Sequence, residues 1–334
     1  MGLLEIIALA LSASSLVMLG VLILRRAHLA RQERRRREME DALKGIAMEL
    51  LHAGAEPPPL GEEERQALAD LLGRYARALR GPTHDRIVDY FEREGTVAKE
   101  LEVMAGARAG WRRAAAAFRL GDIGPASVAG GLCAALEDPD RDVRIAAGRS
   151  LGRLRAPEAT ASLLSAGVDR RLPPALVRWA LLQIGAPALP RLLPGLTDDN
   201  ERLRAGAVQL IGLLGGPSEA AQIEDGLRDT SAMVRAQAAR ALGRIGGGRN
   251  LPALRTATWD RIPEVREAAA EALGQLRDRD SIELLAIRAA GDQFEVARAC
   301  ARAVAAIDPE EAAQRATATG SVHLFEAADL AGIL

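Results

Sequence analysis

The stretch that decides the fold runs from Asp138 to Leu154 and reads Asp-Pro-Asp-Arg-Asp-Val-Arg-Ile-Ala-Ala-Gly-Arg-Ser-Leu-Gly-Arg-Leu. It has an acidic turn, a Val-Arg pair, two small residues and an exit of the form Leu-Gly-x-Leu. The pattern returns along the chain, and its exit glycines are Gly121, Gly152, Gly185, Gly212, Gly243 and Gly274, with Ala305 in the next position. Their separations of 31, 33, 27, 31, 31 and 31 residues indicate stacked supersecondary units.

Each unit is predicted to form two helices. The first carries the Val-Arg pattern, and we expect the exit glycine to end it, because glycine adopts the left-handed conformation without steric penalty. The second helix follows a short turn and is expected at residues 157–168, 187–196, 218–227, 251–259 and 281–290. Strand-forming residues are sparse and no run alternates as a sheet would. The sequence therefore predicts an all-α superhelix of about seven units over residues 109–320.

Aspartate and arginine recur together in the repeat. An aspartate lies six residues before the repeat arginine in four units, at Asp138/Arg144, Asp198/Arg204, Asp229/Arg235 and Asp260/Arg266. In the last unit both residues move by one position, to Asp292 and Arg298. This joint shift indicates a pair. We expect each arginine to bridge its own turn and the aspartate of the next unit, forming a structural ladder rather than a ligand site.

The third unit, which ends at Gly185, departs from the pattern. Its surroundings are rich in proline, at positions 173, 174, 187, 190 and 194, and the spacing to the next exit glycine contracts to 27 residues. We expect the array to bend there. Such a bend makes either a binding notch or an irregular joint, and the sequence favours the joint.

The repeat resembles the HEAT repeat, in particular the short bacterial subclass related to the phycobilin-lyase repeats. The resemblance covers roughly residues 109–320, and four units, beginning near 139, 199, 230 and 261, match closely. It implies an α-α superhelix whose second helices line a concave face used for partner binding. It is specific for the fold and says little about function.

No catalytic or metal-binding constellation is evident. Deoxyhypusine hydroxylase, a relative of this fold, holds iron with His-Glu pairs, but His28, His52, His84 and His323 lie outside the matching first helices and none precedes a glutamate. Histidine is also missing where a Ser or Cys triad would need it. The run Gly246-Gly247-Gly248 is a turn and not a phosphate-binding loop. We therefore expect no enzyme activity, no metal and no cofactor.

Charge and composition bear on the partner. The net charge is −1; residues 25–37 contribute +6 and Glu5 contributes −1, which leaves −6 for residues 38–334. Aromatic residues make up 3% of the chain. Because nucleic-acid grooves need basic surface and aromatic side chains, no nucleic-acid binding is expected. Cys133 and Cys300 lie far apart in apolar helical contexts, which is compatible with a reducing compartment.

Residues 1–24 are predicted to be a membrane anchor. No charged residue lies between Ile6 and Leu24, and a helix of that length spans about 28 Å. Seven arginines follow within residues 25–37, so the excess of positive charge places the rest of the chain in the cytoplasm. A cleaved signal peptide would need basic residues before the apolar core. We expect a single-pass protein of the inner membrane that contacts the bilayer through residues 3–24.

The remaining segments are assigned by pattern. Residues 25–60 are predicted to form a basic juxtamembrane helix and a proline-rich linker, because Glu56-Pro57-Pro58-Pro59 stops the helix. Residues 61–108 are helical but do not match the repeat, so we interpret them as an N-terminal cap. Trp111 is expected to seal this cap to the first repeat. Residues 321–334 are assigned to a C-terminal tail.

The hypothesis for function is a non-catalytic, membrane-anchored scaffold or adaptor that binds a protein partner, itself membrane-associated, through the repeats. Arg255 and Trp259 are candidate partner contacts, because Trp and Arg often anchor interfaces; packing between units is the alternative for Trp259. The alternative function is a lyase-like or regulatory subunit of the phycobilin-lyase type.

Overall fold

The computed structural model describes residues 18–19, 22–23, 25–26, 34 and 37–332, and these form helices and connecting turns without any strand. The chain divides into two compact units. The first comprises residues 1–100 with 122–125, and the second comprises residues 101–121 with 126–334.

The first unit is built from amphipathic helices. Residues 37–53 are helical, followed by α2 (Glu62–Ala78), α3 (Pro82–Arg93) and the start of α4 (Thr96–Gly106). The segment 37–53 buries Leu43 and Leu50, and its end is held by Arg86, whose guanidinium donates to the carbonyl of His52 at 2.8 Å. This helix therefore packs against its own downstream helices.

In the second unit long helices alternate with short ones. The long helices carry the Val-Arg pattern and are α5 (Gly110–Ile123), α7 (Arg141–Leu154), α9 (Pro174–Ile184), α11 (Glu201–Leu214), α13 (Ala232–Ile245), α15 (Pro263–Gln275) and α17 (Phe294–Ile307). The short helices are α6 (Ala129–Ala134), α8 (Thr160–Val168), α10 (Leu189–Leu192), α12 (Ala220–Glu224), α14 (Leu251–Ala257) and α16 (Ile282–Gly291). Short 3₁₀ turns adjoin them at Ala126–Val128, Ala135–Glu137, Pro157–Ala159, Ala186–Ala188, Leu193–Thr197, Asp225–Arg228, Gly248–Asn250 and Arg279–Ser281.

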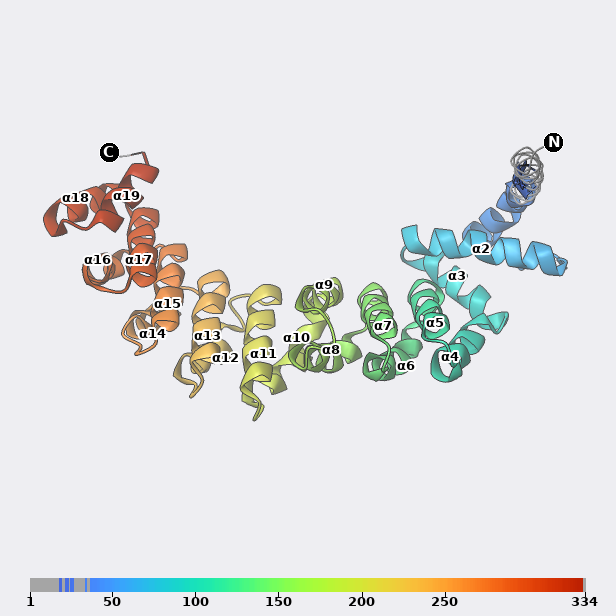
Figure 1. The fold of residues 1–334 in the computed structure, drawn as a ribbon, viewed down its shortest axis with the longest axis horizontal. Helices are drawn as coiled ribbons and strands as arrows, with labels where there is room; N and C mark the ends of the chain where they lie inside the picture. Colours follow the sequence, from blue (N-terminus) through green and yellow to red (C-terminus); the bar gives the residue numbers. More distant parts are fainter. Residues whose placement is uncertain (1–17, 20–21, 24, 27–33, 35–36, 333–334) are drawn as a thin grey trace, which may run out of the picture. The chain divides into compact units, whose positions relative to one another are not determined.

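The long helices form one layer of the second unit and the short helices form the other. From α11 to α17 the row bends, and the long Val-Arg helices lie on the inner side of the bend (Figure 1). The sequence resemblance implied instead that the second helices of each unit line the concave face. The difference follows from packing, because the long helices approach one another through alanine and glycine and so lie closer together than their partners.

We expected each exit glycine to end its helix, but among the described residues this holds only for Gly185, which caps α9. Those at 152, 212, 243 and 274 lie inside the long helices, and of the exit glycines only Gly185 has a positive φ, of 75°. A Cβ on Gly243 would lie 2.9 Å from the Cα of Ala272 in the next long helix. Left-handed residues follow three positions later in two units, at Arg155 and Arg277. The glycines are therefore needed for the close approach of neighbouring helices.

Two further helices follow the repeats. α18 (Pro309–Thr319) leads to α19 (Val322–Leu330), which packs against α16, α17 and α18. Leu324 and Ala328 are buried, and the Ser321 hydroxyl donates to the carbonyl of Ala289 at 2.9 Å. Residues 321–334, assigned to a tail from sequence, thus contain a packed helix, because the last repeat leaves an apolar face that must be covered.

The expected membrane anchor is contradicted. Among the helices formed by the described residues, none combines the length and the apolar composition that crossing a bilayer requires. Most of residues 1–24 lie outside the part of the chain that the structure describes. The expectation rested on the uncharged run from Ile6 to Leu24 and on the arginines that follow it, and a span requires a continuous apolar helix of about 20 residues. The single-pass topology, the inner-membrane localisation and the bilayer contact through residues 3–24 are therefore not supported.

Candidate functional site at a break in the arginine ladder

Arg235 of α13 links the turn before its own helix to the turn of the following unit. Its Nε and Nη2 donate to the two carboxylate oxygens of Asp260 at 2.7 and 2.9 Å. Its Nη1 donates to the backbone carbonyls of Asp229 and Thr230 at 2.9 and 3.2 Å. One guanidinium is thus shared between two units, which is the geometry expected from the Asp/Arg spacing.

The same contact recurs along the unit. At three other pairs the guanidinium binds both carboxylate oxygens at N to O distances from 2.6 to 2.9 Å. In each case Nη1 also donates to a carbonyl of the arginine's own turn, at 2.8 or 2.9 Å. Together with Arg235–Asp260 these pairs form the arginine ladder, whose other members are Arg113–Asp138, Arg204–Asp229 and Arg266–Asp292.

The ladder stabilises its carboxylates in the charged form. Hydrogen bonds from Arg204 hold the pKa of Asp229 below its usual range, against the opposing effect of burial. For Asp292 burial alone raises the pKa, but hydrogen bonds from Arg266 and from the N–H of Gln293 help to outweigh it and lower the pKa to about 2. These aspartates are therefore ionised and fully engaged inside the fold, which supports a structural role.

Arg298 does not belong to the ladder, although it shifts together with Asp292 in the sequence. It pairs with Glu295 of its own helix at 3.0 Å, while Asp292 accepts hydrogen bonds from Arg266. A displacement of one residue turns a side chain by roughly 100° around a helix. The joint shift therefore does not indicate a joint role.

The ladder is interrupted at the third unit. Arg144 donates to its own turn, at the carbonyl of Asp138 (2.8 Å), but on the other side it meets the carbonyl of Arg171 (3.1 Å) instead of an aspartate. Arg178 occupies the position of the repeat arginine in α9, and it is exposed. Within the described residues it makes no hydrogen bond or ion pair, and Asp198 receives only the N–H of Asn200, at 2.8 Å.

The interruption has a packing cause. α9 has 11 residues, whereas α11 and α13 have 14 each. Elsewhere neighbouring long helices pack along one another, but α11 packs more extensively on α8 than on α9. At this place of contracted spacing, α11 thus packs mainly on α8 rather than on the preceding long helix.

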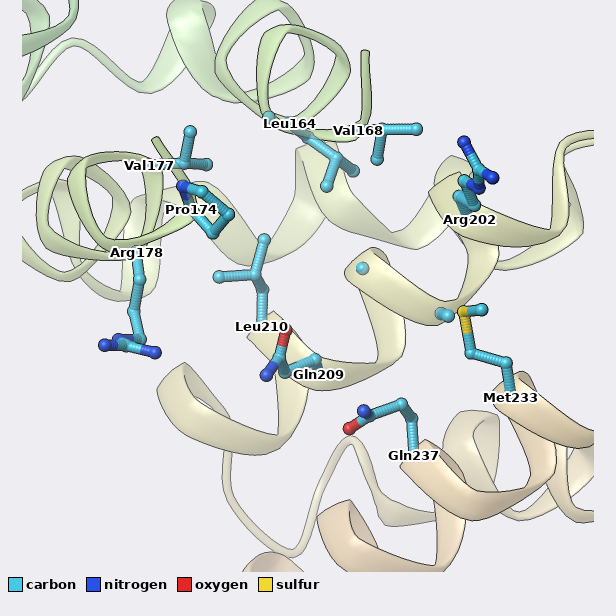
Figure 2. A pocket seen from close by; sticks show the side chains of 13 residues that line it. Leu164, Val168, Pro174, Val177, Arg178, Arg202, Gln209, Leu210, Met233 and Gln237 are labelled. Carbon is cyan, nitrogen blue, oxygen red and sulfur yellow. The ribbon is translucent and has the colours of Figure 1, made fainter. Parts of the chain in front are cut away.

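A cavity of about 260 Å³ lies at this separation. Its apolar lining comes from α8, α9 and α11 and consists mainly of Leu164, Val168, Pro174, Val177 and Leu210. Its polar and flexible lining consists of Arg178, Arg202, Gln209, Met233 and Gln237. Figure 2 shows the two arginines on opposite sides of the apolar side chains. No carboxylate lines this cavity, so a positive rim surrounds an apolar floor.

Small residues shape the floor. A Cβ on Gly206 of α11 would lie 2.8 Å from the Cδ1 of Leu164, and one on Gly167 of α8 would lie 3.0 Å from the Cγ2 of Val177. The two glycines therefore let α8 approach both long helices, and this approach places Leu164 and Val177 in the floor of the cavity.

The two residues that the sequence offered as partner contacts lie elsewhere. Arg255 binds both carboxylate oxygens of Asp278 at 2.6 and 2.5 Å, and Asp278 is buried. Arg255 is thus part of the fold. Trp259 is 65% exposed, and the guanidinium of Arg288, from α16 of the following helix pair, lies 4.2 Å from its ring centroid. Trp259 therefore contacts the next unit while most of its side chain stays exposed. Trp111 is 73% exposed.

The stacked helix pairs and the ladder that joins their turns define the class of this protein, an α-α solenoid. The chain belongs to the HEAT repeat family, whose model matches residues 101–184, 189–264 and 221–306. Among curated proteins, no sequence matches the chain.

Solved structures share the fold at low identity. The complex of CpcE and CpcF of phycocyanin lyase from Nostoc sp. PCC7120 is similar at 23% identity and a TM-score of 0.40, over 44% of this chain and 98% of that chain. Human deoxyhypusine hydroxylase in complex with glycerol is similar at 21% identity and a TM-score of 0.33, over 81% of this chain and 97% of that chain. These likenesses concern the fold alone.

The sequence analysis missed most of the candidate site. It located the irregularity at the third unit but favoured a plain joint over a notch. The available signal was the combination of a 27-residue spacing with a repeat arginine, Arg178, that has no aspartate six positions before it. Nothing in the sequence indicates that Met233 and Gln237, which belong to a later unit, line the cavity, because this depends on how the helices pack.

Proposed function

We propose that this chain is a non-catalytic scaffold that binds a protein partner on the exposed face of its Val-Arg helices. Membership in the HEAT repeat family supports a binding role for the stacked helices. The arginine ladder supports it further, because the Asp and Arg residues that recur in most units hold the units together. The exposed surface differs from unit to unit, and this surface determines which partner a scaffold binds.

The observation that carries the proposal is the charge of this face. From α7 to α13 the long helices expose arginines that form no hydrogen bond or ion pair with any described residue, namely Arg141, Arg149, Arg178, Arg202 and Arg244. Exposed acidic side chains in the same helices are limited to Asp142 and Glu201. A basic face on a chain of net charge −1 attracts an acidic protein surface and speeds its association.

Site-specific photo-crosslinking tests the proposal. A photoreactive side chain at Gln209, on the long-helix layer, should yield one discrete crosslinked protein in cells that produce the chain from its own gene. The matched control is Arg191, which is exposed on the short helix α10 of the other layer, and it should yield none. Equal crosslinking from both layers, or no product from Gln209, would contradict binding on this face.

A further inference from the structure

We infer that the cavity between α8, α9 and α11 is the anchor point of the partner, and that it receives one large aliphatic side chain flanked by carboxylates. This inference rests on the proposed function, because the ligand is taken to be a segment of a protein. It adds the location of the contact and the chemistry of the segment.

The size of the cavity favours a side chain over a complete small molecule. Pockets for drug-sized ligands have volumes of about 300–1,000 Å³, whereas a closed cavity of about 150 Å³ holds one benzene molecule. The cavity here, at about 260 Å³, lies between these limits. Its floor is aliphatic, with Leu164, Val177 and Leu210, so it matches a leucine, isoleucine or methionine side chain.

The rim determines the charge of the segment. Arg178 lacks the aspartate that pairs with the equivalent arginine in the ladder, and Arg202 makes no side-chain hydrogen bond or ion pair within the described part of the chain. The planar guanidinium binds carboxylates in a bidentate manner. With one arginine on each side of the floor (Figure 2), an aliphatic side chain that enters the cavity can carry acidic neighbours on both sides.

The other lining residues suit a peptide and not a nucleic acid. Gln209 and Gln237 offer amide donors and acceptors for a peptide backbone, and Met233 adapts its shape to different side chains. No aromatic residue lines the cavity. Single-stranded nucleic acids bind by stacking their bases on aromatic rings, so the lining favours a protein segment.

Peptide selection on the full chain tests the inference. A library of random peptides of about 12 residues, displayed on phage, is selected on the immobilised protein, and one enriched peptide is synthesised with a fluorescent label. We expect enriched peptides to carry a large aliphatic residue beside Asp or Glu. In titrations followed by anisotropy, Arg178→Glu and Arg202→Glu should each weaken binding by at least roughly 10-fold, because reversal places like charges together.

Two further variants sharpen the test. Gln209→Trp should block the mouth of the cavity and abolish binding, while Arg191→Glu on the short-helix layer should change the affinity by less than about 2-fold. The substituted side chains are exposed. All variants should therefore keep the thermal midpoint of the parent, measured by circular dichroism, so that loss of binding is not loss of folding.

The outcomes separate this inference from the proposed function. Enriched peptides that lose affinity with Arg149→Glu or Arg244→Glu, but not with the cavity variants, would overturn the cavity as the anchor and leave binding on this face intact. Enriched peptides without acidic residues would overturn the stated chemistry. If no peptide is enriched, or if an oligonucleotide alone binds in a manner that depends on Arg178, the inference fails.

Discussion

At the residue scale, a ladder arginine holds together groups that no other residue type would satisfy at once. Arg235 contacts a carboxylate in the next unit and two backbone carbonyls in its own. A lysine has one charged atom and lacks the planar fork, so it would reach only part of this set. The recurrence of arginine at this position therefore follows from the geometry of the turn.

We expect Arg235→Ala to lower the free energy of unfolding by about 3 kcal/mol, because it leaves the half-buried Asp260 carboxylate without its counter-charge. Arg235→Lys should restore about half of the loss, since it returns the charge without the bidentate contact. Urea unfolding followed by circular dichroism measures both. Arg228→Ala serves as the control, because this side chain is 72% exposed and 3.8 Å from Asp225; a comparable loss there would contradict the role of the ladder.

The ladder also predicts how stability depends on pH. Hydrogen bonding lowers the pKa of Asp292 to about 2, although burial opposes this effect. Between about pH 2 and the usual pKa of aspartate, the unfolded chain binds more protons than the folded one. The free energy of unfolding therefore rises with pH in this range, and stability is lost as the pH falls from about 4 toward 2. Asp292 alone accounts for about 2 kcal/mol of this loss.

Urea midpoints measured at pH 5, 4 and 3 should therefore fall steeply for the parent protein. Asp292→Asn should flatten this slope, because it removes the titrating group. The exposed Asp225 is a suitable comparison, and Asp225→Asn should leave the slope unchanged. An identical pH profile for the parent and Asp292→Asn would show that the lowered pKa does not contribute to stability.

At the scale of elements, the spacing of the long helices is set by the neighbouring residue that contacts the exit glycine. In α11, α13 and α15 that neighbour is an alanine of the next long helix. A Cβ at Gly212 would lie 2.8 Å from the Cα of Ala241, and one at Gly274 would lie 2.9 Å from the Cα of Ala303. Backbone cannot move aside as a flexible side chain can, so glycine is required at these positions.

Gly243→Ala should lower the free energy of unfolding by about 1–3 kcal/mol, because the added methyl group forces α13 and α15 apart. The informative comparison is Gly73→Ala in α2, where a Cβ would have no neighbour within 4 Å. There alanine should raise stability by up to about 1 kcal/mol through its helix propensity. Thermal or urea unfolding measures both changes, and a stabilising effect of Gly243→Ala would refute the close approach inferred here.

At the scale of the whole molecule, the second unit is a row in which each helix pair depends on its neighbours. Stability in such rows is close to a sum of unit and interface contributions. The interface between α9 and α11 lacks the ladder pair, and its two long helices pack on each other less extensively than α11 packs on α8. The same place holds the cavity and the unpaired Arg178, so the weakest joint and the candidate binding site coincide.

Hydrogen exchange should detect this joint. Backbone amides of α9 and α10 should open with a free energy at least about 1 kcal/mol lower than those of α13 and α15, because they lack one charged hydrogen-bonded pair. Exchange followed by mass spectrometry resolves these segments. Uniform protection from α7 to α15 would contradict a weak joint. An acidic peptide bound in the cavity should slow exchange in α9 selectively.

The repeat, the helix pairs and the pairing of Asp and Arg could all be predicted because each is a local pattern repeated many times. Predictions drawn from the pattern were wrong where they concerned the role of single positions. Arg298 keeps its distance from Asp292 in sequence but pairs with Glu295 of its own helix. Most exit glycines serve helix contacts, and only Gly185 caps its helix. The membrane anchor expected in residues 1–24 falls mostly outside the described residues, and no described helix is long and apolar enough to cross a bilayer.

The sequence by itself determined that helices alternate with turns and that one arginine in most units binds the carboxylate of the next. These properties depend on spacings of a few residues, which the chain carries directly. Only the tertiary structure decided that the Val-Arg helices lie on the inner side of the bend and that α9 and α11 separate over α8. It also brought Arg178, Arg202 and Met233 around one apolar cavity, because that arrangement depends on how three helix pairs pack and not on any single stretch of chain.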